Sequence, residues 1–185
     1  MKIKEIIFFD GDGTLWYPKR TKRRAAPHWI YSDPEIGEKY LDHMVLTPTI
    51  LTTLKKLKKA GVMLIALSTH PHSPKEADLI LNKKIRHFKL KDIFDEVYAA
   101  RNRQDGKGEA ILRILKQRGI PKSRALMVGD SYRFDYLSAK RVGVDALLIK
   151  SDYMREHPRA EGGKVIIENI SVIASRYKLS ATLYA

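Results

Sequence analysis

Short apolar runs alternate with segments of helical period along most of the chain. The runs that predict strands are Ile3–Phe9, Val62–Leu67, Phe94–Ala99, Ala125–Val128, Asp145–Ile149 and, more briefly, Val165–Ile167. The segments that predict helices run from Thr47 as cap to Gly61, from Ser73 to about His87, and over Lys107–Arg118, Ser131–Val142 and Ser171–Tyr177. Strands that alternate with helices predict an α/β fold, a mostly parallel sheet covered on both faces.

The region from Leu15 to Leu46 has no clear period and interrupts this alternation. It contains a strongly basic run, Lys19–Arg24. We interpret residues 15–46 as a flap inserted after the first strand of one domain that spans residues 1–185. The spacing of the other elements leaves no room for a large helical cap.

Composition narrows the classes of protein. The chain has 185 residues and no cysteine, which excludes disulfides, thiolate metal sites and a cysteine nucleophile. No apolar run approaches about 18 residues and the start lacks a signal-peptide pattern, so we expect a cytoplasmic protein without membrane partners. The net charge of +14 favours anionic partners, or is simply a solvated, lysine-rich surface. Abundant charge with few Asn and Gln suggests a thermophilic source as a hypothesis.

The first apolar run ends in IIFFDGDGT, which places Asp10 and Asp12 at and just beyond a strand end. A calcium loop would need Gly and Glu where Leu15 and Thr21 stand, and a dinucleotide fingerprint would need Gly at Trp16. Two interpretations remain. The segment is a polar turn, or its crowded carboxylates bind a cation or include a catalytic acid.

Other polar residues follow the later strands, where parallel sheets bind ligands. Ser68, Thr69 and His70 follow the second strand, Lys107 opens a helix, and Asp130, Ser131 and Asp135 follow the fourth strand. Taken singly, these residues also fit turns, helix caps or surface positions. A lysine at a helix N-terminus opposes the macrodipole, and a nearby anion would explain Lys107, although a solvated surface lysine is the more common case.

In this order, DGDGT, LST, Lys107 and GDSYRFD resemble the motifs of the haloacid dehalogenase-like (HAD) phosphohydrolase superfamily over Ile3 to about Ile149. The resemblance implies a three-layer Rossmann-like domain and Mg²⁺ dependence. It implies Asp10 as the nucleophile that forms an aspartyl phosphate and Asp12 as the general acid and base. The remaining implied roles are Mg²⁺ binding by Asp10, Asp130 and the backbone carbonyl of Asp12, phosphate binding by Ser68, Thr69 and Lys107, and support from Asp135 and Ser131.

The start DGDGTLWYP also resembles the capless magnesium-dependent phosphatase group, although Gly13 stands where that group carries a tyrosine. The resemblance implies a phosphotyrosine-like or sugar-phosphate substrate, small or on a phosphoprotein. We name Trp16, Arg20 and His70 as candidate substrate contacts. Two alternatives stay open. The basic flap with its aromatic residues suits a polynucleotide-end phosphatase, and the fold could instead serve a non-catalytic basic protein that binds nucleic acid.

Overall fold

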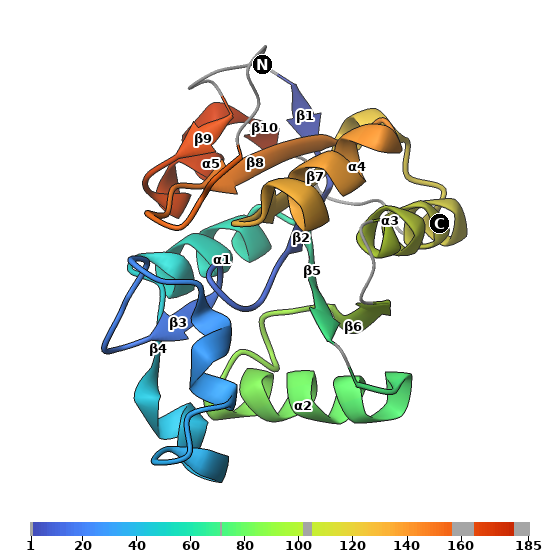
Figure 1. The fold of residues 1–185 in the computed structure, drawn as a ribbon. Coiled ribbons are helices and arrows are strands. Elements are labelled where there is room, and N and C mark those ends of the chain that lie inside the picture. Colours follow the sequence, from blue (N-terminus) through green and yellow to red (C-terminus); the bar gives the residue numbers. More distant parts are fainter. Residues whose placement is uncertain (1, 71, 102–104, 157–164, 180–185) are drawn as a thin grey trace.

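The computed structural model describes residues 2–70, 72–101, 105–156 and 165–179. Its centre is a six-stranded sheet of order β6-β5-β2-β7-β8-β9, in which every neighbouring pair is parallel (Figure 1). The strands are β2 (Ile6–Phe9), β5 (Met63–His70), β6 (Glu96–Arg101), β7 (Ala125–Gly129), β8 (Asp145–Ile149) and β9 (Ile166–Ile167). The predicted α/β, Rossmann-like architecture is confirmed.

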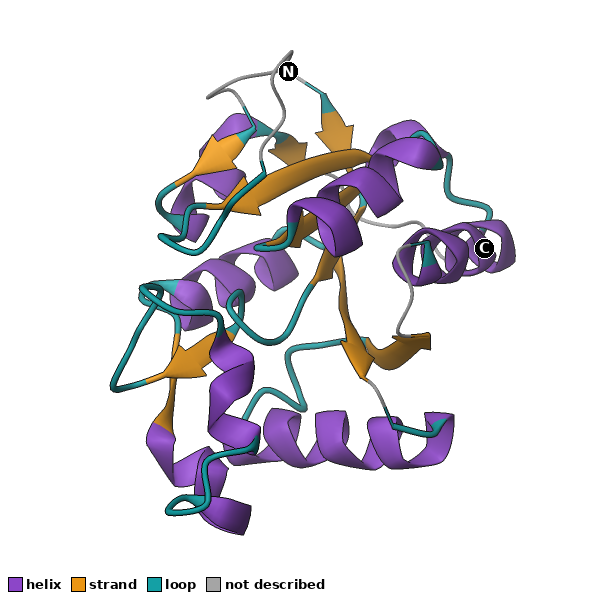
Figure 2. Cartoon of the chain, in the orientation of Figure 1, coloured by secondary structure: helices purple, strands orange, loops and turns teal. Residues whose placement is uncertain are grey.

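Helices cover both faces of this sheet (Figure 2). Side chains alternate along β2, so Ile7 and Phe9 enter one core and Ile6 and Phe8 the other. The first core contains residues of α1 (Ile50–Lys59), α2 (Pro74–His87), η6 (Ile170–Val172) and α5 (Ile173–Arg176). The second contains residues of α3 (Gly106–Arg118), the π-helix η4 (Tyr132–Leu137) and α4 (Ser138–Arg141), and a 3₁₀ turn, η3 (Lys122–Arg124), leads into β7.

The first predicted strand is split at Glu5. β1 (Ile3–Lys4) pairs with β10 (Lys178–Leu179), and only β2 enters the main sheet. The Lys4 side chain is fully buried, and its Nζ donates to Ala125 O over 2.7 Å and to Asp145 Oδ2 over 2.8 Å. The one predicted strand therefore spans two sheets, and the buried Lys4 side chain lies where the chain passes from one to the other.

Two further predicted boundaries are wrong. Helix α1 begins at Ile50, because the hydroxyl of Thr47 donates to Thr14 O over 2.6 Å instead of capping a helix. Strand β5 runs on to His70, so Ser68, Thr69 and His70 are its last residues rather than the turn that follows it. In contrast, α2 has the predicted start, with a capping box between Ser73 and Glu76.

The segment after β2 forms a flap of short elements. These are β3 (Trp16–Pro18), η1 (Pro27–Tyr31), η2 (Gly37–His43) and β4 (Met44–Leu46). β3 and β4 pair antiparallel, with Trp16 opposite Leu46, and so close the base of the flap. In Figure 1 the 3₁₀ helices of this blue segment lie beside α2. No helix in the described part of the chain is long and apolar enough to cross a bilayer.

Candidate active site

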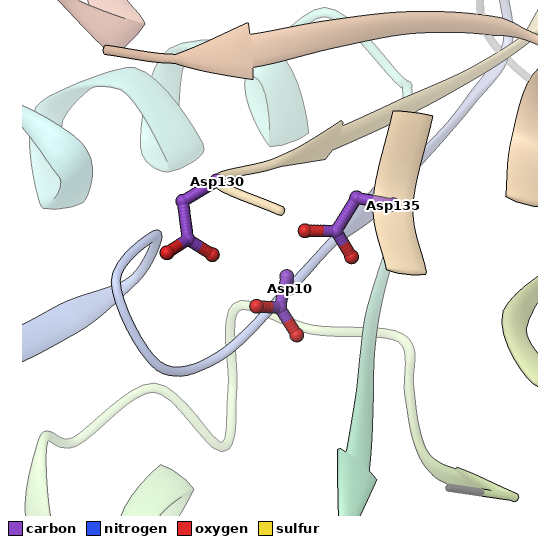
Figure 3. A group of neighbouring side chains, drawn as sticks. All are labelled: Asp10, Asp130 and Asp135. Atoms are coloured by element: carbon purple, nitrogen blue, oxygen red, sulfur yellow. The ribbon is translucent and has the colours of Figure 1, made fainter. Parts of the chain in front are cut away.

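Three carboxylates meet at the carboxyl ends of two adjacent strands. Asp10 follows β2 and Asp130 follows β7, which pair in parallel, and Asp135 lies in η4 just beyond β7. One oxygen of each carboxylate lies within 4.8 Å of an oxygen of the other two, and Figure 3 shows the three groups pointing toward one another. The residues are 7%, 7% and 1% exposed, so water does little to screen their mutual repulsion.

Asp135 reaches this group through an irregular helix start. The prediction of one α-helix from Ser131 to Val142 is wrong in its first half, where a π-helix occupies Tyr132–Leu137. Asp135 Oδ2 accepts from the backbone N–H of Ser131 over 2.8 Å. A Cβ on Gly129 would overlap the Asp135 carboxyl group, so the close approach requires glycine there. The π-helix thus carries a carboxylate inward, a common use of such segments at functional sites.

Lys107 joins this group from the first turn of α3. Its Nζ lies 2.5 Å from Asp10 Oδ1 and 2.5 Å from Asp135 Oδ1, and the side chain is buried. Burial alone would lower the pKa of Lys107, but the two carboxylates outweigh burial and raise it. Lys107 therefore stays an ammonium, and of the two explanations for a lysine at this helix start the structure supports a nearby anion rather than a solvated surface position.

The carboxylates outnumber the ammonium that pairs with them. Burial and the negative charges of Asp10 and Asp135 raise the pKa of Asp130 well above its usual value, although Tyr153 donates a hydrogen bond to it. Burial also raises the pKa of Asp135 to about 6, against the opposing effect of Lys107. Oxygen ligands alone, with excess negative charge, suit a hard divalent cation. The Asp12 carboxylate is not part of this group.

Gly13 shows how tightly the group is enclosed. It has a φ of +81°, and a Cβ there would overlap the Asp130 carboxylate. The hydroxyl of Tyr153 would lie 2.6 Å from the same Cβ. A tyrosine at this position, as in the magnesium-dependent phosphatase group, does not fit this arrangement.

Asp12 has a separate set of partners. The indole N–H of Trp16 donates to Asp12 Oδ1 over 2.6 Å, and the hydroxyl of Tyr31 lies 2.7 Å from each Asp12 oxygen. Lys84 Nζ lies 3.2 and 3.1 Å from the two oxygens. Burial would raise the pKa of Asp12, but the charge of Lys84 and these hydrogen bonds hold it below its usual value. The residue is therefore a carboxylate with neutralised charge.

Sequence reasoning missed Tyr31 and Lys84. The sequence did contain a signal for Lys84. This residue falls within the apolar stripe that Leu81 and Ile85 form on α2 and that Phe88 continues just after the helix, rather than on the polar face. Tyr31 carried none, because the flap has no period from which a buried position can be identified.

One cavity of about 1130 Å³ is lined by residues of both sets, although neither Asp135 nor Trp16 is part of its lining. Asp10, Asp12, Ser68, Thr69 and Lys107 all line it. The Ser68 hydroxyl lies close to the loop that carries Asp10 and Asp12, since a Cβ on Gly11 would come within 3.1 Å of it. The cavity also has an aromatic and basic lining, contributed by Tyr31, Tyr40, Lys83, Tyr132, Arg133 and Phe134.

The remaining predicted residues divide between the cavity and its surroundings. Ser131 lines the cavity, and its hydroxyl caps η4 by accepting from Phe134 N over 3.2 Å. His70 also lines it, 7% exposed, and its Nε2 has no hydrogen-bond partner among the described residues. Burial, with the nearby charge of Lys84, lowers the pKa of His70 to about 4, so the imidazole is neutral near pH 7.

The structure does not bring Trp16 or Arg20 to the cavity lining. Trp16 is fully buried and stacks on Phe88 at 5.4 Å, so it reaches the cavity only through Asp12. Arg20 lies over the ring of Trp29, 5.1 Å from its centroid, and lines a separate surface hollow of about 440 Å³. These placements do not fit direct contact with a substrate bound at Asp10.

Comparison with models of known protein families finds a match for this chain. A model described as haloacid dehalogenase-like hydrolase matches residues 32–149, a range that includes Ser68, Lys107, Asp130 and Asp135. Asp10 and Asp12 precede that range. Among solved structures, a haloacid dehalogenase-like family hydrolase from Xanthomonas campestris has a TM-score of 0.69 over 95% of both chains. Its sequence identity is 16%, so it supports the fold alone.

Two curated relatives carry the name phosphoglycolate phosphatase. The protein from Pseudomonas savastanoi is 27% identical in an alignment 165 residues long that covers 81% of this chain. The protein from Pseudomonas fluorescens is 35% identical over 124 residues, or 66% of this chain. The chain spans only 58% and 43% of the lengths of these two relatives.

Proposed function

The chain belongs to the haloacid dehalogenase-like hydrolase family, and we propose that it is a Mg²⁺-dependent phosphomonoesterase that forms an aspartyl phosphate on Asp10. The observation that carries this proposal is the Asp10 carboxylate itself. It lines an open cavity, contacts Lys107 at 2.5 Å, and lies beside two further buried carboxylates. A carboxylate in this setting can attack phosphorus once its neighbours' charge is compensated.

The proposed reaction has two halves. An Asp10 oxygen bonds to phosphorus and the bond from phosphorus to the leaving oxygen breaks, while Asp12, which has first taken up a proton from solvent, gives that proton to the leaving oxygen. Water then attacks the phosphorus of the aspartyl phosphate, Asp12 takes a proton from the water, and inorganic phosphate leaves a free Asp10 carboxylate. Lys107 remains protonated throughout and offsets charge on the phosphoryl group.

We propose that Asp10, Asp130 and the backbone carbonyl of Asp12 hold the Mg²⁺. The ion would supply the positive charge that allows a phosphate dianion to approach these carboxylates. Ser68 and Thr69 would donate hydrogen bonds to the phosphoryl oxygens, which fits their place at the end of β5 on the cavity wall. The unpartnered Nε2 of His70 is our candidate for contact with the part of the substrate beyond phosphorus.

The substrate class follows from the cavity and from Asp12. Because three donors stabilise Asp12 as a carboxylate, leaving groups of low basicity, such as aryl alcohols, place the least demand on proton donation. A cavity of about 1130 Å³ with aromatic walls also accommodates an aryl group. We therefore propose phosphotyrosine-like esters first, with sugar phosphates and phosphoglycolate, the substrate named for the two relatives, as the comparison set.

Hydrolysis of p-nitrophenyl phosphate tests this proposal. We expect turnover with Mg²⁺, none with EDTA, and a loss of at least about 10³-fold in kcat for Asp10→Asn. The matched control is Asp92→Asn, which changes an exposed aspartate outside the cavity lining and should retain wild-type activity. Turnover that survives both EDTA and Asp10→Asn would contradict the proposal, as would its absence on every ester in the comparison set.

A further inference from the structure

The hydrogen bonds to Asp12 come from three different elements. Trp16 belongs to β3 at the base of the flap, Tyr31 to η1 farther along the flap, and Lys84 to α2. Lys84 Nζ also donates to the Tyr31 hydroxyl over 2.7 Å, which closes a triangle of Asp12, Tyr31 and Lys84. The ammonium lies 4.6 Å from the centroid of the Tyr31 ring.

We propose that Tyr31 and Lys84 are positioning residues that hold the Asp12 carboxylate and thereby couple the flap to the proton-transfer step. This inference rests on the proposed function, since it assigns the two residues a role through Asp12. Neither residue needs to touch the reacting phosphorus. Their effect is to fix which way the Asp12 oxygens face.

The burial of Lys84 is the first argument. Its side chain is 1% exposed and the Asp12 side chain 9% exposed, at an ion-pair distance of 3.1 Å. Placing an ammonium in the apolar stripe of α2 gives up its hydration, and a buried ion pair is weak evidence for added stability. An apolar side chain would fill the same place without that cost, so a role in orienting Asp12 accounts for the lysine.

The position of Tyr31 is the second argument. It is the last residue of η1, and its ring packs edge-on against Tyr40 of η2 at 5.1 Å. The Tyr31 hydroxyl lies 2.7 Å from each Asp12 oxygen, and this contact joins the flap to the loop that carries Asp10 and Asp12. Any displacement of η1 away from α2 would break the hydrogen bonds from Tyr31 to Asp12 and from Lys84 to Tyr31. The orientation of Asp12 therefore depends on the position of the flap.

The variants Tyr31→Phe and Lys84→Met test the inference, with kcat and KM measured separately on p-nitrophenyl phosphate and glycerol phosphate. We expect each to lower kcat about tenfold or more on glycerol phosphate, whose leaving group needs a proton, with KM little changed. The loss on p-nitrophenyl phosphate should be smaller. Lys84→Arg, which keeps the charge, should recover part of the loss.

Controls separate positioning from general destabilisation. Tyr177→Phe removes a tyrosine hydroxyl of a residue outside the cavity lining, and Lys75→Met removes an exposed lysine of the same helix as Lys84, α2. Both should keep wild-type kcat on both esters. Thermal unfolding of every variant then shows whether a loss of kcat merely follows a loss of folded protein.

A double-mutant cycle decides the question. If Tyr31 acts through Asp12, then Tyr31→Phe should have little further effect on kcat for p-nitrophenyl phosphate in an Asp12→Asn background. Additive losses, or equal losses on the two esters, would overturn the inference. If wild type itself shows no Mg²⁺-dependent turnover, the proposed function fails. If wild type is active and the variants match it, only the inference fails.

Discussion

Two clusters of buried charge face the same cavity, and they differ in charge balance. Around Asp10, three carboxylates share the single ammonium of Lys107. Around Asp12, one carboxylate pairs with the ammonium of Lys84 and accepts from Tyr31 and Trp16. The second cluster is complete within the protein, whereas the first needs a cation. The comparison separates the cluster that we propose receives a metal and a phosphate from the cluster that we propose holds the Asp12 carboxylate in a fixed orientation.

Of the substitutions in the two clusters, removal of Lys107 should have the largest effect on stability and activity. Lys107→Met leaves the three carboxylates without their ammonium, so we expect a loss of about 3–5 kcal/mol in unfolding free energy without metal. We also expect a fall of at least about 10²-fold in kcat, because charge on the phosphoryl group is no longer offset. Thermal melts and steady-state kinetics measure both effects, with the exposed Lys122→Met as control. A variant as stable as wild type would contradict the predicted charge excess.

Neutralising Asp12, in the cluster where one carboxylate pairs with one ammonium, should destabilise the protein. Asp12→Asn leaves Lys84 buried opposite a neutral amide, and we expect a loss of about 2–3 kcal/mol, or several degrees in Tm. Adding Mg²⁺ should not restore this loss, because the Asp12 carboxylate is not among the clustered ligands. The prediction fails if the melting temperature of Asp12→Asn rises.

Neutralising Asp130, in the cluster with excess negative charge, should change the stability in the opposite direction. Without metal, Asp130→Asn removes one of three repelling buried carboxylates, so we expect Tm to rise by the equivalent of about 1–2 kcal/mol. Mg²⁺ should raise the Tm of wild type and leave that of Asp130→Asn nearly unchanged. An equal Mg²⁺ shift in both proteins would show that the ion binds elsewhere.

The smallest effect is a pH dependence of stability in metal-free protein. Burial raises the pKa of Asp135 to about 6, above the usual value of about 3.9, so the folded state binds this proton more tightly than the unfolded state. The contribution of Asp135 to the free energy of unfolding is therefore complete below about pH 4, and it is lost as the pH rises through about 6. The pKa of Asp130 is also raised, so this residue contributes to stability with the same sign and adds to the decline as the pH rises. Denaturant unfolding at a series of pH values with EDTA measures it, and stability that rises over this window would contradict it.

The sheet and much of the carboxylate cluster were accessible from the sequence because both follow local rules. Apolar runs predicted all six strands of the main sheet to within about three residues, and polar residues at strand ends converge in any parallel sheet. The order of Asp10, Ser68, Lys107 and Asp130 along the chain was therefore enough to predict that they gather at one edge.

The rest depends on contacts between distant segments. The π-helix places Asp135 where its carboxylate accepts from Lys107 Nζ and from the backbone N–H of Ser131. Helical periodicity in the sequence cannot predict these contacts. The break at Glu5 depends on β10, near the far end of the chain. Tyr31 lies in a flap without periodicity, and Lys84 looks like an ordinary helix lysine until its place in the apolar stripe is noticed.

The central claim is that Asp10 becomes phosphorylated, and trapping that intermediate tests it most directly. The enzyme is mixed with p-nitrophenyl phosphate and Mg²⁺, quenched in acid within the first turnover, digested and analysed by mass spectrometry. The account predicts one added phosphoryl group on the peptide that contains Asp10, and none with EDTA or in Asp10→Asn. Steady turnover with no phosphorylated Asp10 at any quench time, or with the phosphoryl group on another residue, would contradict it.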